Sequence, residues 1–155
     1  MTGAGAASGA DLVRLLPHRP PMLLLDTAEQ VSERCLVAHQ EIPIDSPFLA
    51  GHFPGLPVWP GALLAEAMAQ TTAVYLLNSR AGLRDGEVPV LGAVDCHFLR
   101  PVFPGDCITY RAELIRRLAD LGLFAVTARR GTQVVARARI TAGVTLVSSL
   151  LDWSR

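Results

Sequence analysis

The sequence predicts an α+β domain in which a curled antiparallel sheet of about five to six strands wraps around one long central helix. Only one long stretch, Ala62 to Asn78, lacks both glycine and proline and is apolar on almost every side, as a buried helix is. Two strand-like segments precede it, and four follow with tight turns between them. One long helix cannot supply the crossovers of a parallel sheet, so the strands are expected to pair antiparallel.

Length and composition restrict the chain to one domain. It has 155 residues, of which 50% are hydrophobic and 18% charged, and 14 basic residues balance 14 acidic ones. A disordered chain would be less apolar and more charged, and a nucleic-acid binder usually carries a basic excess. No apolar run reaches the roughly 18 to 20 residues that a membrane-spanning helix needs. The apolar surface that the core leaves over is available to a partner subunit.

The domain is expected over residues 11–147, after a disordered lead-in over residues 1–10 and before a C-terminal tail over residues 148–155. The lead-in has neither the basic nor the apolar region of a signal peptide. The three cysteines are odd in number and show no CxxC spacing, which fits a reducing compartment better than a disulfide framework. We therefore expect a cytoplasmic protein.

The segment before the long helix predicts a short helix and two strands. Asp11 is a suitable N-cap for a helix that runs through Leu16 and ends at a proline. An apolar run from Met22 to Leu25 opens the first strand. A turn at Glu33-Arg34 then leads into a second strand over Cys35 to Ile42.

Four further strands follow the long helix and are rich in Val, Ile, Leu and Thr. Glycine- or proline-containing turns separate them, so the last three are expected to form an antiparallel meander. The expected strands are Val88–Phe98, Asp106–Leu118, Leu121–Arg130 and Gln133–Val147.

A long loop leads into the helix and carries a histidine. Residues 43–61 hold five prolines and three glycines, and loops of this length in a compact domain are often functional. His52 lies in the middle of this loop, although a lone loop histidine is usually a surface residue. Gly61 is expected near the helix N-terminus, where a backbone N–H has no intrahelical acceptor and the helix dipole is positive.

The helix itself carries one carboxylate, Glu66. Burial is expected to raise the pKa of this group and to suit it to proton donation. Gln70 lies one turn further along the same face, where it can orient the carboxyl. The helix alone leaves an alternative open, in which Glu66 points to solvent through a gap in the packing. Together with His52 and the Gly61 N–H, the carboxyl would supply the base, acid and oxyanion donor that proton abstraction beside a carbonyl requires.

Three segments of the chain resemble one enzyme family. They are PFLAGHFPGLPVWPGALLAEAMAQ (Pro47 to Gln70), LLPHRPPMLLLD (Leu15 to Asp26) and FLRPVFPGD (Phe98 to Asp106). They are similar, in the same order, to the active-site signature and two flanking motifs of the 3-hydroxyacyl-[acyl-carrier-protein] dehydratases. This is the short, dehydratase-only branch of the hot-dog superfamily. The match covers roughly Asp11 to Thr141.

The resemblance implies a hot-dog fold and a hydro-lyase that acts without a metal or organic cofactor. It would convert (3R)-3-hydroxyacyl thioesters to trans-2-enoyl thioesters in fatty-acid or polyketide-type biosynthesis. His52 would take the α-proton, and its ring would bind the Val58 carbonyl. Glu66 would hold or protonate the departing hydroxyl, and the Gly61 N–H would polarise the thioester carbonyl. Two alternatives stay open: both residues act, or His52 shuttles the proton alone while Glu66 positions a water.

The resemblance also implies the partners. In the family the histidine and the carboxylate come from different subunits, so we expect a homodimer with shared sites, alone or as a trimer of dimers. Its substrate would be carried on the phosphopantetheine arm of an acyl carrier protein. The related bifunctional dehydratase-isomerases have aspartate where Glu66 stands, so Glu66 favours dehydration without isomerisation.

Two sets of residues are candidates for substrate binding. An acyl-chain tunnel would be lined by Phe53, Trp59, Leu63 and Met68, with the ordinary core as the alternative. The acidic carrier protein would dock on a patch made of arginine, because the chain has no lysine. The candidates are Arg100, Arg116, Arg117, Arg129 and Arg130, with solvated strand faces as the alternative.

The other histidines are given no catalytic role. His18 is expected to help hold the N-terminal segment, and the four histidines and three cysteines are too scattered for a metal site. Two rival functions stand beside the dehydratase. A hot-dog acyl thioesterase would not need the HFPG loop, and a non-catalytic hot-dog acyl-binding or partner subunit typically lacks the histidine or the acid.

Overall fold

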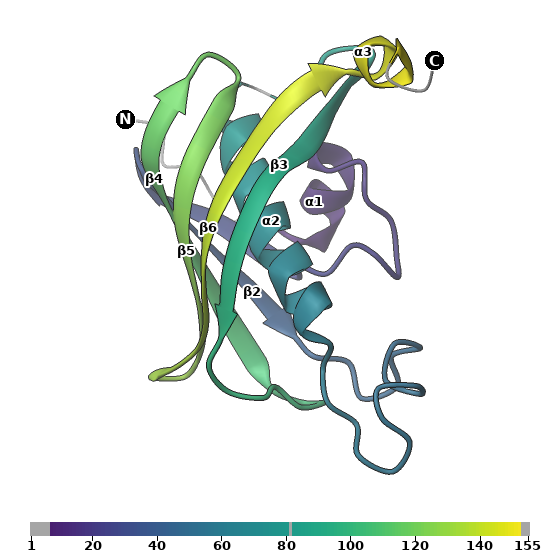
Figure 1. Ribbon diagram of the computed structural model, residues 1–155. Coiled ribbons are helices and arrows are strands. Elements are labelled where there is room, and N and C mark those ends of the chain that lie inside the picture. The colour runs from purple at the N-terminus through teal and green to yellow at the C-terminus, as the bar shows by residue number, and fades with distance from the viewer. Residues whose placement is uncertain (1–6, 81, 153–155) are drawn as a thin grey trace.

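One antiparallel sheet curls around the helix α2 (Figure 1). The computed structural model describes residues 7–80 and 82–152, over which the chain forms six strands and three helices. The helices are α1 (Gly9–Leu15), α2 (Gly61–Asn78) and α3 (Val147–Leu151). The strands are β1 (Thr27–Ser32), β2 (Cys35–Glu41), β3 (Glu87–Phe98), β4 (Cys107–Leu118), β5 (Leu121–Arg130) and β6 (Gln133–Leu146). The predicted α+β fold with a curled sheet and a central helix is confirmed.

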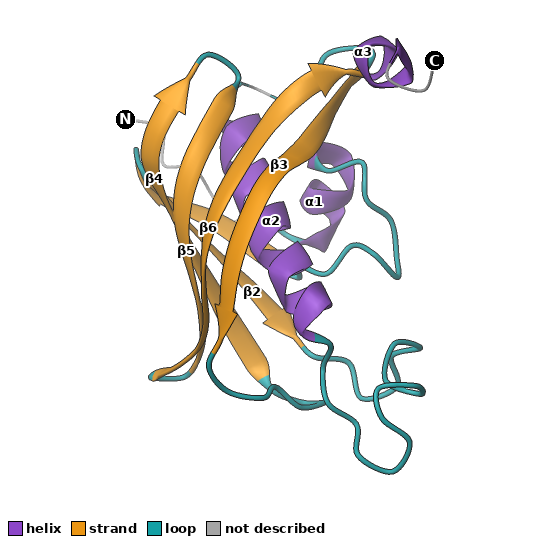
Figure 2. Cartoon of the chain, viewed as in Figure 1, coloured by secondary structure: helices purple, strands orange, loops and turns teal. Residues whose placement is uncertain are grey.

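The strands lie in the order β1-β2-β4-β5-β6-β3, and every neighbouring pair is antiparallel. Figure 2 shows β4, β5, β6 and β3 side by side. The chain crosses the sheet through α2, so β3 follows β2 in sequence but lies at the opposite edge. Register shifts interrupt the ladders, for example between Leu91 and Ala93 and between Leu114 and Arg116. Such bulges increase local twist and help the sheet to curl around α2.

The first strand begins later than the apolar run predicts. Residues Met22 to Leu25 are irregular, and β1 begins at Thr27. The Met22 carbonyl and the Leu24 N–H bond to the side chain of Gln70 rather than to another strand. These backbone groups are therefore unavailable to the sheet, and the expectation of a strand there is wrong.

The N-terminal helix begins at Gly9, with Ser8 rather than Asp11 as its N-cap. Asp11 instead accepts hydrogen bonds from the Ser8 N–H and hydroxyl at 3.0 and 2.9 Å, which completes a capping box. Of the expected disordered lead-in, residues 1–6 lie outside the described part. Ala7 pairs with Ala28 in an isolated bridge, so order begins before residue 10. The last three residues of the expected tail, 153–155, also lie outside the described part.

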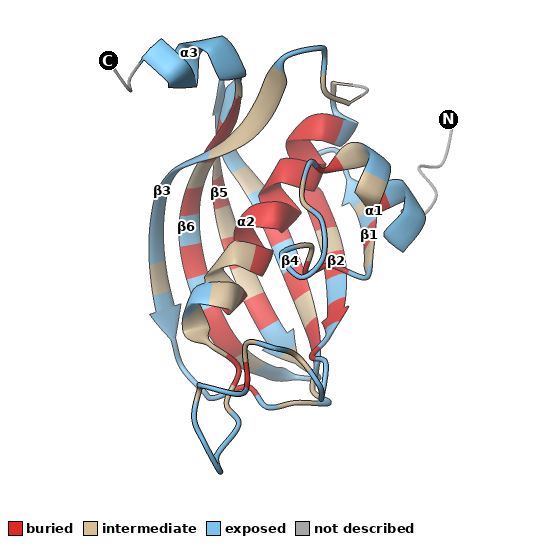
Figure 3. Cartoon of the chain, turned by 90° about the vertical axis from the view of Figure 1, so that its right-hand side faces the viewer, coloured by how far each residue is buried: buried red, intermediate tan, exposed pale blue. Residues whose placement is uncertain are grey.

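The core lies between α2 and the concave face of the sheet. Buried residues follow α2 from Ala67 onward and alternate along β4, β5 and β6 (Figure 3). The ring of Tyr75 packs edge-on against Phe124, with ring centroids 5.3 Å apart. None of the described helices is long and apolar enough to cross a membrane.

The edge strand β3 is exposed along most of its length (Figure 3). Leu91, Val94 and Phe98 are 48%, 44% and 51% exposed in the single chain. A long edge strand with apolar side chains and free backbone groups can pair with another chain.

Candidate active site

His52 is held by the backbone of its own loop, beside the N-terminus of α2. The ring Nδ1 lies 2.8 Å from the Val58 carbonyl oxygen, as predicted, and the Val58 N–H donates to the His52 carbonyl at 2.9 Å. Because a carbonyl only accepts, Nδ1 carries the proton of the neutral ring and Nε2 is left as the basic nitrogen. The Phe53 ring stacks on the imidazole with centroids 4.2 Å apart.

His52 and Gly61 share one cavity of about 380 Å³. Gly61 is the first residue of α2, so its N–H has no intrahelical acceptor. The Phe98 ring packs close to Gly61, and a Cβ added at Gly61 would lie 3.2 Å from it. The remaining wall is mostly apolar and comprises Val58, Trp59, Leu64, Leu99, Arg100, Pro101 and Val102. The imidazole of His52 and a backbone N–H that has no partner among the described residues thus line one mostly apolar cavity.

Glu66 lies in a second cavity of about 190 Å³, where α2 faces the first half of β3. From α2 it is lined by Glu66, Ala69, Gln70 and Ala73, a spacing that puts all four on one helix face. The opposite wall is Pro89, Val90, Leu91 and Ala142. His52 does not line this cavity, and Glu66 does not line the other. One chain therefore presents His52 and Glu66 in separate cavities.

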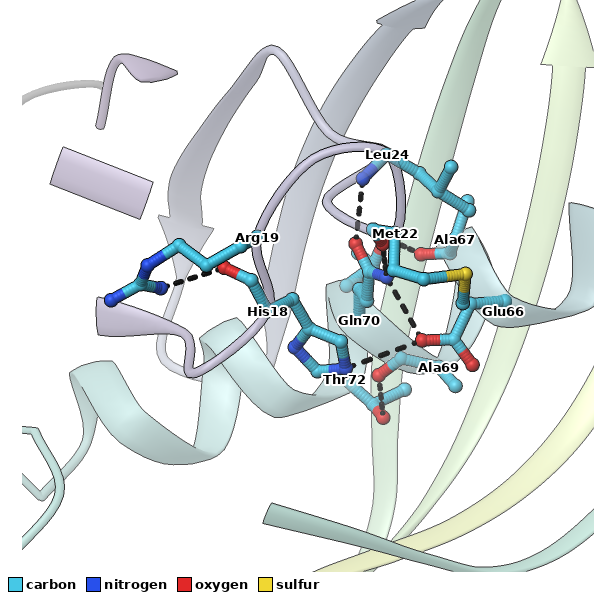
Figure 4. A network of polar contacts seen from close by, with 10 residues as sticks. His18, Arg19, Met22, Leu24, Glu66, Ala67, Ala69, Gln70 and Thr72 are labelled. Carbon is cyan, nitrogen blue, oxygen red and sulfur yellow. Dashed lines mark hydrogen bonds and ion pairs between the residues drawn. The ribbon is translucent and has the colours of Figure 1, made fainter. Parts of the chain in front are cut away.

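Gln70 orients the carboxylate from one turn away, as predicted. Its Nε2 donates to Oε1 of Glu66 at 2.9 Å and to the Met22 carbonyl at 2.6 Å, and its Oε1 accepts from the Leu24 N–H at 3.0 Å (Figure 4). The side chain is 1% exposed. Because all three bonds need this orientation of the amide, its donor end is fixed toward Glu66.

His18 is the site residue that the sequence did not reveal. Its Nε2 lies 3.3 Å from the same oxygen of Glu66, Oε1, and it lines the same cavity (Figure 4). The hydrogen bond from His18 holds the pKa of Glu66 below its ordinary value, against burial, with a smaller contribution from Gln70. The raised pKa expected for a carboxyl on an apolar helix is therefore wrong, because two donors outweigh the loss of water. The proline-rich segment around His18 was the available signal.

The four residues predicted to line a tunnel lie in different surroundings. Trp59 is buried and lines the His52 cavity, whereas Phe53 is 53% exposed. Leu63 is half-buried against the core, on the same face of α2 as Glu66. Met68 is fully buried in the core and lines neither of these cavities, so the core alternative holds there. Two residues along a helix turn the side chain by about 200°, away from Glu66.

The five predicted arginines do not form one patch. Arg116 and Arg117 lie near the β4–β5 turn, whereas Arg129 and Arg130 lie at the other end of the same ladder. The two ends are about 30 Å apart, since a strand rises about 3.3 Å per residue. Arg130 is also paired with an aspartate at 2.7 Å. Arg100 is the arginine that borders the His52 cavity.

Most of the chain is similar to one family of known proteins. Residues 16–139 match the model of the FabA-like domain. The chain is 38% identical over 119 residues to the 3-hydroxyacyl-[acyl-carrier-protein] dehydratase FabZ of Clostridium perfringens, an alignment that covers 76% of this chain and 84% of that protein.

Solved structures share the fold. The dehydratase heterocomplex ApeI:P from Xenorhabdus doucetiae superimposes with a TM-score of 0.78 at 20% identity, over 93% of this chain and 97% of that one. A hot-dog-like protein from Thermanaerovibrio acidaminovorans gives a TM-score of 0.63 at 19% identity, over 77% and 87%. These neighbours identify the fold as the hot-dog fold.

The neutral ring of His52 is expected to be the Nδ1–H tautomer, because Val58 offers only a carbonyl oxygen. Nitrogen-15 NMR of the imidazoles near pH 8 checks this. His39 is the internal control, because its Nδ1 faces a Thr109 hydroxyl that can donate or accept. A His52 spectrum typical of the Nε2–H tautomer would contradict the assignment of Nε2 as the base.

Proposed function

This chain belongs to the FabA-like family of 3-hydroxyacyl-[acyl-carrier-protein] dehydratases, and we propose that its two cavities are complementary halves of one dehydratase site. The enzyme is a hydro-lyase that dehydrates (3R)-3-hydroxyacyl thioesters of acyl carrier protein to trans-2-enoyl thioesters. Its pathway is fatty-acid or polyketide-type biosynthesis. The observation that carries the proposal is His52, with Nε2 as its basic nitrogen, in one apolar cavity with the free N–H of Gly61.

The first half of the site breaks the C–H bond. In the proposed reaction Nε2 of His52 takes the α-proton, while the Gly61 N–H binds the thioester carbonyl oxygen as negative charge develops there. The dipole of α2 adds to this stabilisation, since Gly61 is its first residue. The apolar wall strengthens both interactions because it excludes water.

The second half holds the hydroxyl that leaves. The low pKa of Glu66, which the His18 hydrogen bond causes, favours an ionised carboxylate near neutral pH. A carboxylate accepts hydrogen bonds, so Glu66 would hold the substrate's 3-hydroxyl rather than protonate it. The proton taken by His52 then passes to the departing oxygen, the C–O bond breaks, and enoyl thioester and water leave. Of the two alternatives, the site therefore favours His52 as the proton shuttle.

We propose that the two halves meet across a homodimer built on β3. Pro89–Leu91, near the start of this exposed edge strand, border the Glu66 cavity, and Phe98, at its end, borders the His52 cavity. Two copies of β3 that pair antiparallel about a two-fold axis would place the start of one strand beside the end of the other. His52 of the partner subunit would then approach Glu66.

The substrate would enter on the carrier protein at the His52 side. Arg100 is the predicted docking residue that borders this cavity, and the acidic carrier protein would be attracted to it. Trp59 lies in the same wall, where its bulk would limit the acyl chain. A cytoplasmic location stays a prediction, which the free thiols of Cys35, Cys96 and Cys107 support.

Removal of either reacting group is expected to abolish most activity. His52→Ala and Glu66→Gln should each lower the rate of hydroxyacyl-to-enoyl conversion by roughly 10²-fold or more. Absorbance of the enoyl thioester measures the rate, and circular dichroism checks the fold. Full activity in His52→Ala would exclude this histidine as the base. Released thiol in place of enoyl product would support the thioesterase alternative.

A mixture of the two inactive variants tests the shared site. After subunit exchange, half of the dimers contain one copy of each variant, and each of these has one site with both His52 and Glu66. We expect about a quarter of wild-type activity. Each variant alone, treated in the same way, is the control. No recovery after exchange has been demonstrated by mass spectrometry would contradict the interface assignment.

The Gly61→Ala variant tests whether the thioester needs the space beside the Gly61 N–H. Its Cβ would lie 3.2 Å from the Phe98 ring, so the ring must shift in the cavity where the thioester is proposed to bind. We expect kcat to fall at least tenfold with the fold retained. Gly51→Ala is the matched control from the same loop, because its Cβ would meet nothing within 4 Å. Equal activity in both variants would argue against binding of the thioester beside Gly61.

A further inference from the structure

His18 and Gln70 bind the same oxygen of Glu66 and leave the other one free. Both contacts, at 3.3 and 2.9 Å, are made to Oε1. Figure 4 shows the two dashed lines meeting on one carboxylate oxygen while the second points away from both donors. Oε2 makes no hydrogen bond or ion pair with any residue that the structure describes. The two ends of the carboxylate are therefore not equivalent.

The loop that carries His18 is anchored both before and after this residue. Before it, Leu16 is 1% exposed in the core, and the Arg19 guanidinium donates to the carbonyls of Leu16 and His18 at 2.9 and 2.7 Å. After it, Gln70 binds Met22 and Leu24. Side-chain hydrogen bonds to the loop backbone thus fix the position of His18 against α2.

The tautomer of the His18 ring follows from the surroundings of its other nitrogen, Nδ1. Nδ1 is buried and has no hydrogen-bond partner among the described residues. A buried N–H on Nδ1 would be left without an acceptor, at a greater cost than a buried lone pair. Of the two neutral tautomers, the one with its proton on Nε2 is therefore favoured, and this N–H donates to Oε1 of Glu66.

We propose that His18 is a positioning residue of the dehydratase: its Nε2–H holds Oε1 of Glu66 so that Oε2 alone meets the 3-hydroxyl of the substrate. This inference rests on the proposed function. His18 touches no reacting atom in this scheme and acts through Glu66. Among the described residues that line the cavity, Gln70 is the other donor to Oε1, and the rest of the wall (Ala69, Ala73, Pro89–Leu91 and Ala142) has no side-chain donor.

Few titratable or charged groups of the described residues face Glu66. His18 is the titratable group in contact with it, and Arg19 is directed to backbone carbonyls. The residues that β3 and β6 contribute to the cavity carry no titratable side chain. The proposed dimer would add His52 of the partner subunit. A test in the His52→Gln background removes that imidazole.

Carbon-13 NMR of the glutamate carboxyls, in that background, measures the contact without turnover. The Glu66 signal is assigned by its loss in Glu66→Gln. His18→Leu removes the donor and leaves burial opposed mainly by Gln70, so the pKa of Glu66 should rise. His18→Gln retains an N–H donor and should restore the low pKa. His39→Gln, at an exposed histidine outside the site, is the control and should change nothing. An unchanged pKa of Glu66 in His18→Leu would overturn the inference.

Kinetics in the His52-intact enzyme provide the second measurement. We expect kcat of His18→Leu to fall by roughly 10- to 100-fold with KM almost unchanged, and His18→Gln to recover most of it. A higher pKa leaves less ionised Glu66 at a given pH, so the acid limb of the kcat profile should move to higher pH in His18→Leu. An equal loss at every pH in both variants would indicate a merely structural role and would also overturn the inference.

The two levels of the proposal fail separately. Wild-type protein that dehydrates no 3-hydroxyacyl thioester would reject the proposed function, whatever the NMR titration shows. Normal wild-type turnover together with a Glu66 pKa that does not change in His18→Leu would reject only the role of His18.

Discussion

The buried side-chain amide of Gln70 is the interaction on which the site depends. With one donor on Glu66, one on the Met22 carbonyl and its oxygen on the Leu24 N–H, it joins the segment before the sheet to the central helix. An unsatisfied amide at 1% exposure would be costly, so each of these bonds stabilises the orientation that the other two need. They remove Met22–Leu25 from the sheet and bring His18 to the carboxylate.

The same network reverses the electrostatics expected of Glu66. Burial in an apolar helix disfavours the charged carboxylate, but the donors of His18 and Gln70 favour it more strongly. The sequence of the helix shows that Glu66 lies among apolar residues, and it contains Gln70, one of the two donors to the carboxylate. The dominant donor comes from 48 positions earlier in the chain. A carboxylate that stays ionised can hold a hydroxyl group but has no proton to give, and this limits the chemistry open to the second cavity.

The predictable parts of the molecule are those that local pattern determines. β5 was predicted at Leu121–Arg130 as observed, and α2 begins at Gly61, one residue before the predicted stretch without glycine or proline. The contacts of His52 with Val58 and of Glu66 with Gln70 also span few residues. The pairing of His18 with Glu66 depends on how a loop crosses a helix, and the separation of Arg116 from Arg129 depends on the strand register. Neither follows from spacing along the chain.

Sheet topology explains why one chain presents Glu66 and His52 in different cavities. α2 crosses the sheet at an angle to β3, so the helix N-terminus meets the end of β3 and the Glu66 face meets its beginning. No rotation of a side chain moves His52 from one end of this strand to the other. A second copy paired along β3 runs in the opposite direction and would bring the missing group to each cavity. On this argument the exposed edge with Leu91, Val94 and Phe98 is a requirement of the chemistry, because a covered edge would leave both half-sites incomplete.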